Sequence, residues 1–242
     1  MSAPVIELRG LRYAWPGAGH DCLAIDALSL DAGSTLFLHG PSGCGKSTLL
    51  GLLAGVLLAR EGTVSLLGTP WSAWLGARRD GVRADHVGYI FQQFNLLPYL
   101  SVLDNVLLPC RLSSLRRERA VQRSGSVHEA AHRLLRDIGL PRGHWQRAAS
   151  QLSVGQQQRV AAARALIGQP DLVIADEPTS ALDAALRIDF MDLLLGECRA
   201  AGRALVFVSH DERLAGLFDR RLSLPHVNRA LVEGPATEGA VS

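Results

Sequence analysis

The chain has 242 residues, 48% of them hydrophobic, and a formal net charge of +2. This length and composition predict one medium-sized α/β domain with enough apolar material for a core. A nearly neutral charge gives no general attraction to nucleic acid or anionic lipid, so we expect no nucleic-acid partner. Residues 1–7 lack the segments of a secretory signal, and the apolar run at 48–59 is too short to cross a bilayer. We therefore expect any role at a membrane to depend on a partner protein.

The cysteines argue against two kinds of structural support. Cys22, Cys44, Cys110 and Cys198 lie far apart and form no C-x-x-C pair. This spacing disfavours a structural zinc site and a disulfide framework, and a reducing cytoplasm suits it best.

The chain contains 24 arginines and a single lysine, Lys46, within residues 40–47, GPSGCGKS. This segment matches the phosphate-loop pattern G-x-x-x-x-G-K-[ST]. We expect a strand at 35–38 and a helix at 48–58, an order that points backbone N–H groups at an anion. A compact ammonium fits such a loop better than a guanidinium, so Lys46 is expected to reach the outer phosphates of a nucleotide and Ser47 to offer its hydroxyl to Mg2+. The candidate nucleotide-binding residues here are Gly40, Pro41, Ser42, Gly43, Cys44, Gly45, Lys46, Ser47 and Thr48.

The middle of the chain predicts helices. Ser126 and Glu129 have the spacing of a capping box, and an apolar helix face follows before the stop signal at Gly139. This face comprises Ala131, Leu134, Leu135 and Ile138. Upstream lies a basic run of Arg111, Arg116, Arg117, Arg119 and Arg123. We favour a solvated helix face for this run, and contact with lipid headgroups is the alternative.

A second group of chemically active residues follows an apolar segment at 172–175. A continuous apolar run of this kind is typical of a strand buried on both faces of a parallel sheet. It ends in Asp176 and Glu177, at the edge where such sheets bind ligands. We expect Asp176 to hold Mg2+, through water, and Glu177 to polarise the water that attacks the γ-phosphate. An exposed acidic turn is the alternative interpretation.

Residues 152–159, LSVGQQQR, resemble the signature sequence of ATP-binding cassette (ABC) ATPases. The other elements of that family follow in the expected order. Gln92 resembles the Q-loop residue, Asp183 the D-loop residue and His210 the switch histidine, while Trp15 lies where the family places an aromatic ring against adenine. Tyr13 is a rival for that contact, but its alternation with Leu11 predicts a core position. The resemblance covers residues 5–232.

The resemblance implies an α/β P-loop fold with a mixed, mostly parallel sheet core, a helical subdomain and an N-terminal antiparallel β region. We expect a single domain over 1–242, with the core at about 1–92 and 166–232. The helical subdomain would occupy about 93–165, and a short tail 233–242.

The resemblance also implies ATP and Mg2+ as ligands, and a second copy of the chain that pairs head to tail. Ser153, Gly155, Gln156 and Asp183 would then contact the nucleotide held by the partner copy. His210 would steady the γ-phosphate, and Gln92 would contact the metal site and link it to the helical subdomain. Val154 replaces the glycine usual in the signature. If that position needs an unusual backbone angle, hydrolysis would be slow; we favour a neutral replacement.

Residues 91–106 resemble the ATPases of lipoprotein-release, macrolide-export and cell-division systems. That resemblance implies an integral membrane permease as partner, a peripheral position on the cytoplasmic side of the inner membrane, and export of the mechanotransmission type. An importer ATPase for a small solute is the alternative. A cassette protein acting on DNA or the ribosome is disfavoured, because the chain lacks a long coiled-coil insertion, a second cassette and cysteine-rich zinc modules.

Overall fold

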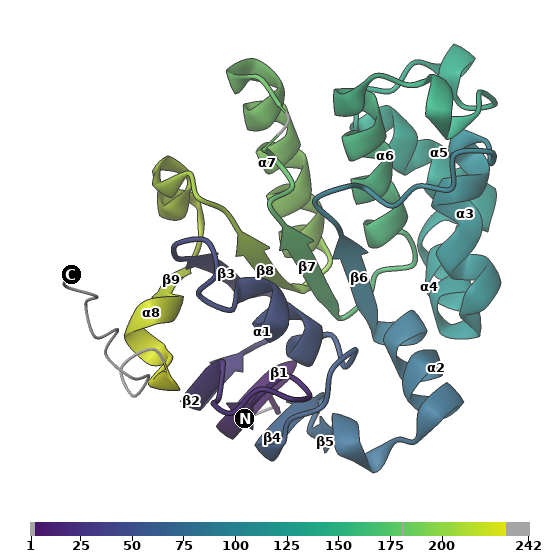
Figure 1. Ribbon diagram of the computed structural model, residues 1–242. Coiled ribbons are helices and arrows are strands. Elements are labelled where there is room, and N and C mark those ends of the chain that lie inside the picture. Colours follow the sequence, from purple (N-terminus) through teal and green to yellow (C-terminus); the bar gives the residue numbers. More distant parts are fainter. Residues whose placement is uncertain (1–2, 181, 231–242) are drawn as a thin grey trace.

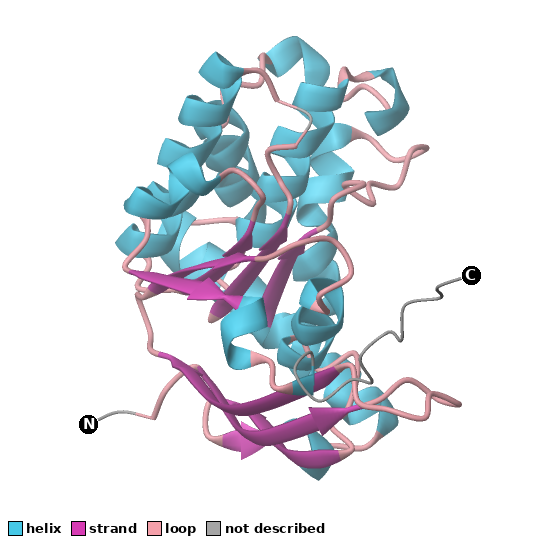
Figure 2. Ribbon diagram, turned by 60° about the vertical axis from the view of Figure 1, so that its left-hand side comes forward, coloured by secondary structure: helices cyan, strands magenta, loops and turns pink. Residues whose placement is uncertain are grey.

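The computed structural model describes residues 3–180 and 182–230. It contains two sheets (Figures 1 and 2). The first has four antiparallel strands in the order β2-β1-β4-β5, with inward side chains buried along β1 and β2. Its strands are β1 (Ile6–Tyr13), β2 (Leu23–Leu30), β4 (Glu61–Leu66) and β5 (Thr69–Pro70). The expected N-terminal antiparallel region is confirmed.

The second sheet has five strands in the order β6-β7-β8-β3-β9, and all its pairs are parallel. Its strands are β3 (Thr35–His39), β6 (Val87–Ile90), β7 (Leu172–Asp176), β8 (Ala204–Val208) and β9 (Arg220–Ser223). The central strands are buried on both faces, as their continuous apolar sequences predict. The α/β fold class is confirmed, and the antiparallel pairs are confined to the first sheet.

Helices separate and flank the sheets. In Figure 1, α1 lies between them, and its buried leucines pack against apolar side chains of both. Helices α3 to α6 gather beside the β6 edge, with α7 near β7 and β8 (Figure 1). The helices are α1 (Lys46–Leu53), α2 (Gly76–His86), α3 (Val102–Leu112), α4 (Ser114–Ser124), α5 (Val127–Asp137), α6 (Val154–Leu166), α7 (Ala184–Ala200) and α8 (Leu224–Val227). Short 3-10 helices occupy Trp71–Ala73, Arg142–His144, Ala149–Gln151 and Glu212–Leu217. No helix in the described ranges is long and apolar enough to cross a membrane.

The helix that follows the phosphate loop ends earlier than its apolar pattern predicts. The expected range was 48–58, but α1 ends at Leu53 and Gly55 has a φ of +69°. A Cβ atom at Gly55 would lie 2.4 Å from the ring of Trp71. The Gly55 N–H donates to the Leu52 carbonyl at 3.1 Å and the Val56 N–H to the Gly51 carbonyl at 2.9 Å, which is the usual pattern of a glycine that ends a helix. Gly55 is therefore a local stop signal, and the Trp71 ring leaves no room for a side chain at this position.

The helix expected after Ser126 is confirmed. The Ser126 side chain accepts a hydrogen bond from the Glu129 backbone N–H at 3.0 Å, which is the first half of a capping box. Ala131, Leu134 and Leu135 are buried against the other helices of the group.

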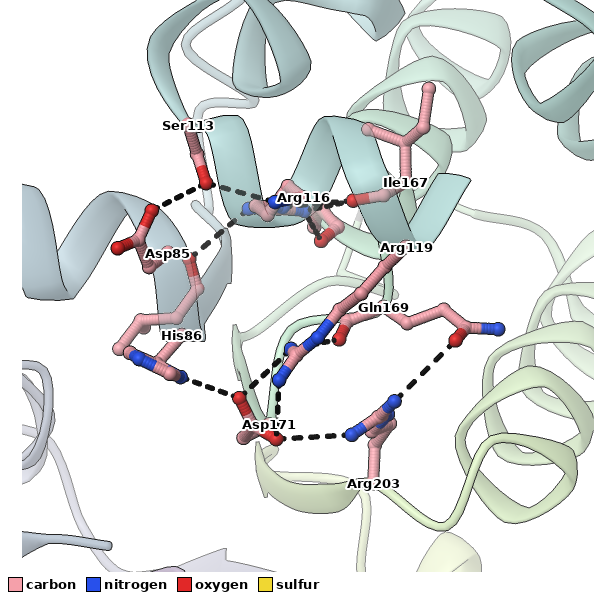
Figure 3. A network of polar contacts seen from close by, with 11 residues as sticks. Asp85, His86, Ser113, Arg116, Arg119, Ile167, Gln169, Asp171 and Arg203 are labelled. Atoms are coloured by element: carbon pink, nitrogen blue, oxygen red, sulfur yellow. Dashed lines mark hydrogen bonds and ion pairs between the residues drawn. The ribbon is translucent and has the colours of Figure 1, made fainter. Parts of the chain in front are cut away.

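The solvated face expected for the basic run is wrong for two of its arginines. Arg116 is only 3% exposed and donates from Nε to the Ile167 carbonyl at 2.8 Å. Arg119 pairs with Asp171 at 2.9 Å (Figure 3). Arg123 is exposed and lies 3.8 Å from Glu197. These contacts turn the Arg116 and Arg119 guanidinium groups toward the protein, so the lipid-headgroup alternative is wrong for these two as well.

Candidate functional site

The phosphate loop connects β3 to α1 through glycines in left-handed conformations. Gly43 and Gly45 have φ angles of +81° and +99°, which favour glycine. A Cβ atom at Gly45 would also lie 2.8 Å from Leu23 Cδ2 on β2. The loop therefore requires glycine here both for its turn and for its close approach to the antiparallel sheet.

Lys46 folds back over this loop. Its Nζ atom donates to the carbonyl oxygens of Gly40 at 2.7 Å and Pro41 at 3.0 Å. No side chain caps the N-terminus of α1, and Ser47 in its first turn is exposed. The ammonium group and the open end of the helix thus face the same loop, an arrangement that suits a phosphate chain.

The acidic pair lies where β7 ends, as its sequence predicts. Glu177 has a φ of +48°, and its backbone N–H donates to the Val208 carbonyl of β8 at 3.1 Å. His210 follows β8, and its Nε2 atom lies 3.1 Å from Glu177 Oε1. Two adjacent strands therefore bring the carboxylate and the imidazole together, and a left-handed backbone at Glu177 is the kind of strain that gathers at functional sites.

Both carboxylates have pKa values above the usual range. Burial raises the pKa of Asp176, although the nearby Lys46 ammonium opposes this. Burial also raises the pKa of Glu177, which His210 and Lys46 oppose. The Glu177 side chain is 12% exposed, and among the described residues its buried Oε1 accepts no hydrogen bond, although His210 Nε2 lies 3.1 Å away. The alternative of an exposed acidic turn is therefore wrong.

The adenine candidates lie at the end of the β1–β2 hairpin. Tyr13 is buried, as expected, whereas Trp15 is 49% exposed and meets the Tyr13 ring edge-on at 5.4 Å. The hairpin borders the phosphate loop, because the Cys22 carbonyl oxygen lies 3.5 Å from a Cβ placed on Gly45. Trp15 is thus partly exposed at the end of a hairpin whose second strand borders this loop.

The signature residues form the N-terminus of α6. The Ser153 hydroxyl accepts from the Gln156 N–H at 3.4 Å, and the Gln156 side chain accepts from the Ser153 N–H at 3.1 Å, which completes a capping box. Val154 is the first residue of the helix and does not have a positive φ. The unusual backbone angle that would make valine unfavourable is therefore absent at this position.

Asp183 also caps a helix. Its side chain accepts from the Leu186 N–H of α7 at 2.9 Å. Within the described ranges, no hydrogen bond joins Ser153, Gln156 or Asp183 to residues 40–48. The structure thus brings Lys46, Asp176, Glu177 and His210 together in one copy, and leaves the signature and D-loop residues apart from them.

One pair of residues near the site was not predicted. Arg187 on α7 donates to the Leu182 carbonyl at 3.1 Å and to Asp211 at 2.6 Å. Hydrogen bonds from Arg213, supported by Arg187, lower the pKa of Asp211 to about 2. The pair connects the segment around Asp183 to the segment around His210. The only sequence signal is an arginine one helical turn after Asp183 and an acid directly after His210.

Phe91, the residue before Gln92, lines a groove between β6 and the helical group. A cavity of about 250 Å3 is lined by Tyr89, Phe91, Leu108, Pro109, Leu112 and Arg116, among others. A second cavity of about 450 Å3 shares Tyr89, Phe91 and Leu112 with it. The two cavities form a mainly apolar groove next to the exposed Gln92, hereafter the β6 groove.

Comparisons with known proteins agree with this geometry. Residues 24–180 match the family described as "ABC transporter". The chain is 39% identical over 231 residues to the uncharacterized ABC transporter ATP-binding protein YbbA of Escherichia coli K12, covering 95% of this chain and 97% of YbbA. It is 39% identical over 229 residues to the lipoprotein-releasing system ATP-binding protein LolD of Novosphingobium aromaticivorans, covering 93% and 97% of the two chains.

A longer relative and a solved structure complete the comparison. The macrolide export ATP-binding/permease protein MacB of Rhodopirellula baltica is 37% identical over 218 residues, which are 89% of this chain but 31% of MacB. The dimeric post-hydrolysis structure of the ATP-binding cassette MJ0796, bound to ADP and Pi, superposes with a TM-score of 0.78 at 31% identity, covering 90% of this chain and 93% of that one. The chain therefore belongs to the ABC transporter family, as one of its ATP-binding cassettes, and is an ATPase.

Proposed function

We propose that the chain is the ATP-hydrolysing subunit of a membrane exporter, and that it drives a separate permease by pairing with a second copy of itself. The observation that carries this proposal is the β6 groove. It places an apolar docking surface directly beside Gln92, on a chain whose own described helices do not span a membrane. The relatives LolD and MacB, whose names state lipoprotein release and macrolide export, support the export class.

The site residues fit MgATP. Ser47 offers an exposed hydroxyl, and Asp176 offers a carboxylate whose pKa burial raises, so a cation would relieve an unfavourable charge. These two residues, with Gln92, would hold Mg2+. When bound, the cation would neutralise charge on the transferring phosphoryl group. Lys46, which now donates to loop carbonyls, would exchange them for phosphate oxygens.

Glu177 has the features of a residue that positions water. Its buried Oε1 lacks a hydrogen-bond partner among the described residues, and its raised pKa brings its basicity closer to neutral pH. His210 Nε2 lies 3.1 Å from Glu177 Oε1, and His210 would steady the γ-phosphate. Trp15 would stack on adenine with its exposed face. We assign Glu177 as the general base and His210 as its neighbour on the phosphate side.

A second copy would complete the site. Ser153, Gly155, Gln156 and Asp183 make no hydrogen bond to the phosphate loop of their own copy within the described ranges, and Ser153 and Gly155 lie at the N-terminus of α6. A head-to-tail pair would bring that N-terminus to the γ-phosphate held by the other copy. The dimeric MJ0796 cassette supports this arrangement.

The domain division follows the same scheme. We propose a core at about 1–92 and 166–232, which holds MgATP, and a helical subdomain at about 93–165, which carries α3 to α6 and one wall of the β6 groove. The tail at 233–242 lies outside the described residues. Docking of a permease in the groove would place the chain on the cytoplasmic side of the inner membrane.

The experiment is a pull-down from detergent-solubilised native membranes with the Glu177→Gln protein and MgATP. We expect a permease with few spans and a large extracytoplasmic domain to co-purify. A many-spanning permease with a solute-binding protein would favour the importer alternative, and ribosomes or DNA without a membrane protein would refute the transport function.

Two surface variants test the groove itself. Leu112→Asp places a charge in the β6 groove at a side chain that is 71% exposed, so folding should be preserved. Leu75→Asp makes the same change at an 83% exposed leucine that does not line either groove cavity. Loss of the permease with Leu112→Asp alone supports the groove. Equal recovery with both variants would show that the permease docks elsewhere.

A further inference from the structure

The segment after Gln92 has a strained backbone that one side chain holds in place. Phe94 and Asn95 have φ angles of +60° and +48°, a region that non-glycine residues rarely adopt, and in which phenylalanine is particularly uncommon. Arg164 donates from Nη1 to the Asn95 carbonyl and from Nη2 to the Phe94 carbonyl, both at 2.7 Å. Its planar fork thus spans the two strained residues, which a lysine ammonium cannot do in the same way.

Arg164 belongs to α6, the helix that begins with the signature. It lies about three turns from Ser153 on a rigid element. The C-terminal end of α6 is fixed as well, because Arg116 of α4 donates to the carbonyls of Ala165 at 2.6 Å and Ile167 at 2.8 Å (Figure 3). If the segment at 92–95 moves, it must therefore either carry α6 with it or break the Arg164 contacts.

Arg116 and Arg164 both line the β6 groove. An occupant of the groove would touch the two side chains that hold the end of α6 and the strained segment. The groove, the residues after Gln92 and the signature helix are therefore joined by guanidinium-to-carbonyl contacts through well-packed structure.

We propose that Arg164 is a positioning residue, which makes the segment at 92–95 and the signature helix α6 move together when the β6 groove is occupied. This role rests on the proposed function, in which Gln92 contacts Mg2+ and α6 closes the site of the partner copy. Arg164 acts through Gln92 and Ser153 and touches no reacting atom.

Arg159 provides a matched control. It lies on the same helix and also donates from Nη1 to a backbone carbonyl, that of Ile138 at 3.0 Å. That carbonyl belongs to the end of α5, inside the helical group, and not to the segment after Gln92. Arg159→Gln therefore removes the same kind of contact from the same helix without releasing Phe94 and Asn95.

Hydrogen exchange of the full chain, measured by mass spectrometry without nucleotide, tests the contact. The Phe94 and Asn95 amides donate to the carbonyls of Phe91 at 3.0 Å and Gln93 at 2.6 Å, so their exchange reports on this turn. We expect Arg164→Gln to speed exchange in peptides covering 92–96 by roughly tenfold, Arg164→Lys to do so less, and Arg159→Gln to leave it unchanged. Equal exchange in Arg164→Gln and the parent, or an equal effect of Arg159→Gln, would overturn the proposal.

The dependence of ATP hydrolysis on Mg2+ concentration provides a second readout. Arg164→Gln should lower kcat roughly tenfold and raise the Mg2+ concentration for half-maximal rate, with KM for ATP within about twofold. If these arginines had a merely structural role, Arg164→Gln and Arg159→Gln would instead both raise KM for ATP and lower the melting temperature. The two proposals fail separately. If no permease is recovered, the proposed function fails while the exchange result stands; if a permease is recovered but exchange is unchanged, the positioning role fails alone.

Discussion

The two ends of β7 carry acidic residues that are equally buried but oppositely arranged. Asp171, just before the strand, is 13% exposed, and Glu177, just after it, is 12% exposed. Burial by itself raises the pKa of Asp171, but His86 and Arg119 outweigh it and the pKa is lowered. Arg203 adds a third contact at 3.0 Å (Figure 3). Around Glu177, His210 and Lys46 do not outweigh burial, and its pKa is raised.

This difference distinguishes a carboxylate that stabilises the fold, Asp171, from one suited to catalysis, Glu177. The paired carboxylate at one end fastens α2, α4 and the starts of β7 and β8 to one another. The carboxylate at the other end, hereafter the unpaired end, makes no ion pair with an arginine in the described ranges, and it retains an unsatisfied atom and a disfavoured charge. A buried polar group left without a partner costs stability, so a protein retains one where function requires it.

The largest expected effect is on hydrolysis at the unpaired end. Glu177→Gln removes the proposed base while keeping the shape of the side chain, so hydrolysis should fall by about 100-fold or more and ATP binding should persist. With MgATP this variant should form a stable dimer, which sedimentation measures. Hydrolysis at the parent rate would remove Glu177 from the role of base.

The second effect is on stability at the paired end. Asp171→Asn leaves Arg119, Arg203 and His86 without their shared carboxylate and should lower the free energy of unfolding by about 3 kcal/mol. Urea denaturation measures this loss. Asp80→Asn is the control, because Asp80 pairs with Arg83 on an exposed surface, and it should cost less than about 1 kcal/mol. Equal losses would show that the Asp171 contacts do not fasten the elements together.

A third effect concerns pH, with opposite signs at the two ends. The folded pKa of Asp171 is lowered, so its stabilisation is present above the unfolded pKa of about 4 and is lost as pH falls. The folded pKa values of Asp176 and Glu177 are raised, so stability is lost as pH rises through them. Without nucleotide at neutral pH, Asp176→Asn should therefore raise the melting temperature by about 2–4 °C. This gain should vanish at pH 3, and a gain that persists there has another cause.

The smallest expected effect is at Val154. Because this residue is exposed and does not have a positive φ, Val154→Gly should change kcat by less than about twofold. Steady-state ATPase assays measure this. A rise of tenfold or more would show that the signature needs glycine in the assembled dimer.

Some of these features were predictable from the sequence, because their causes are local. The apolar runs at 35–38 and 172–175 gave β3 and β7, and the sequence of β7 placed Asp176 and Glu177 at the edge of the sheet. The phosphate loop needed only its own glycines and Lys46 to be identified.

Other features depend on partners far away in the chain. The Trp71 ring leaves no room for a side chain at residue 55, and Arg116 turns inward because the Ile167 carbonyl receives it. Arg187 meets Asp211 only after α7 and β8 are in place. No helical or strand periodicity records such contacts, so they emerge only from the assembled fold.

The most direct test compares Glu177→Gln and Asp171→Asn in one pair of assays, single-turnover ATP hydrolysis per folded molecule and urea unfolding. The account predicts that Glu177→Gln loses hydrolysis and keeps its stability, whereas Asp171→Asn loses stability and its folded molecules hydrolyse ATP near the parent rate. The reverse pattern, hydrolysis retained by Glu177→Gln and lost by folded Asp171→Asn, would contradict the division of β7 into a catalytic end and a supporting end.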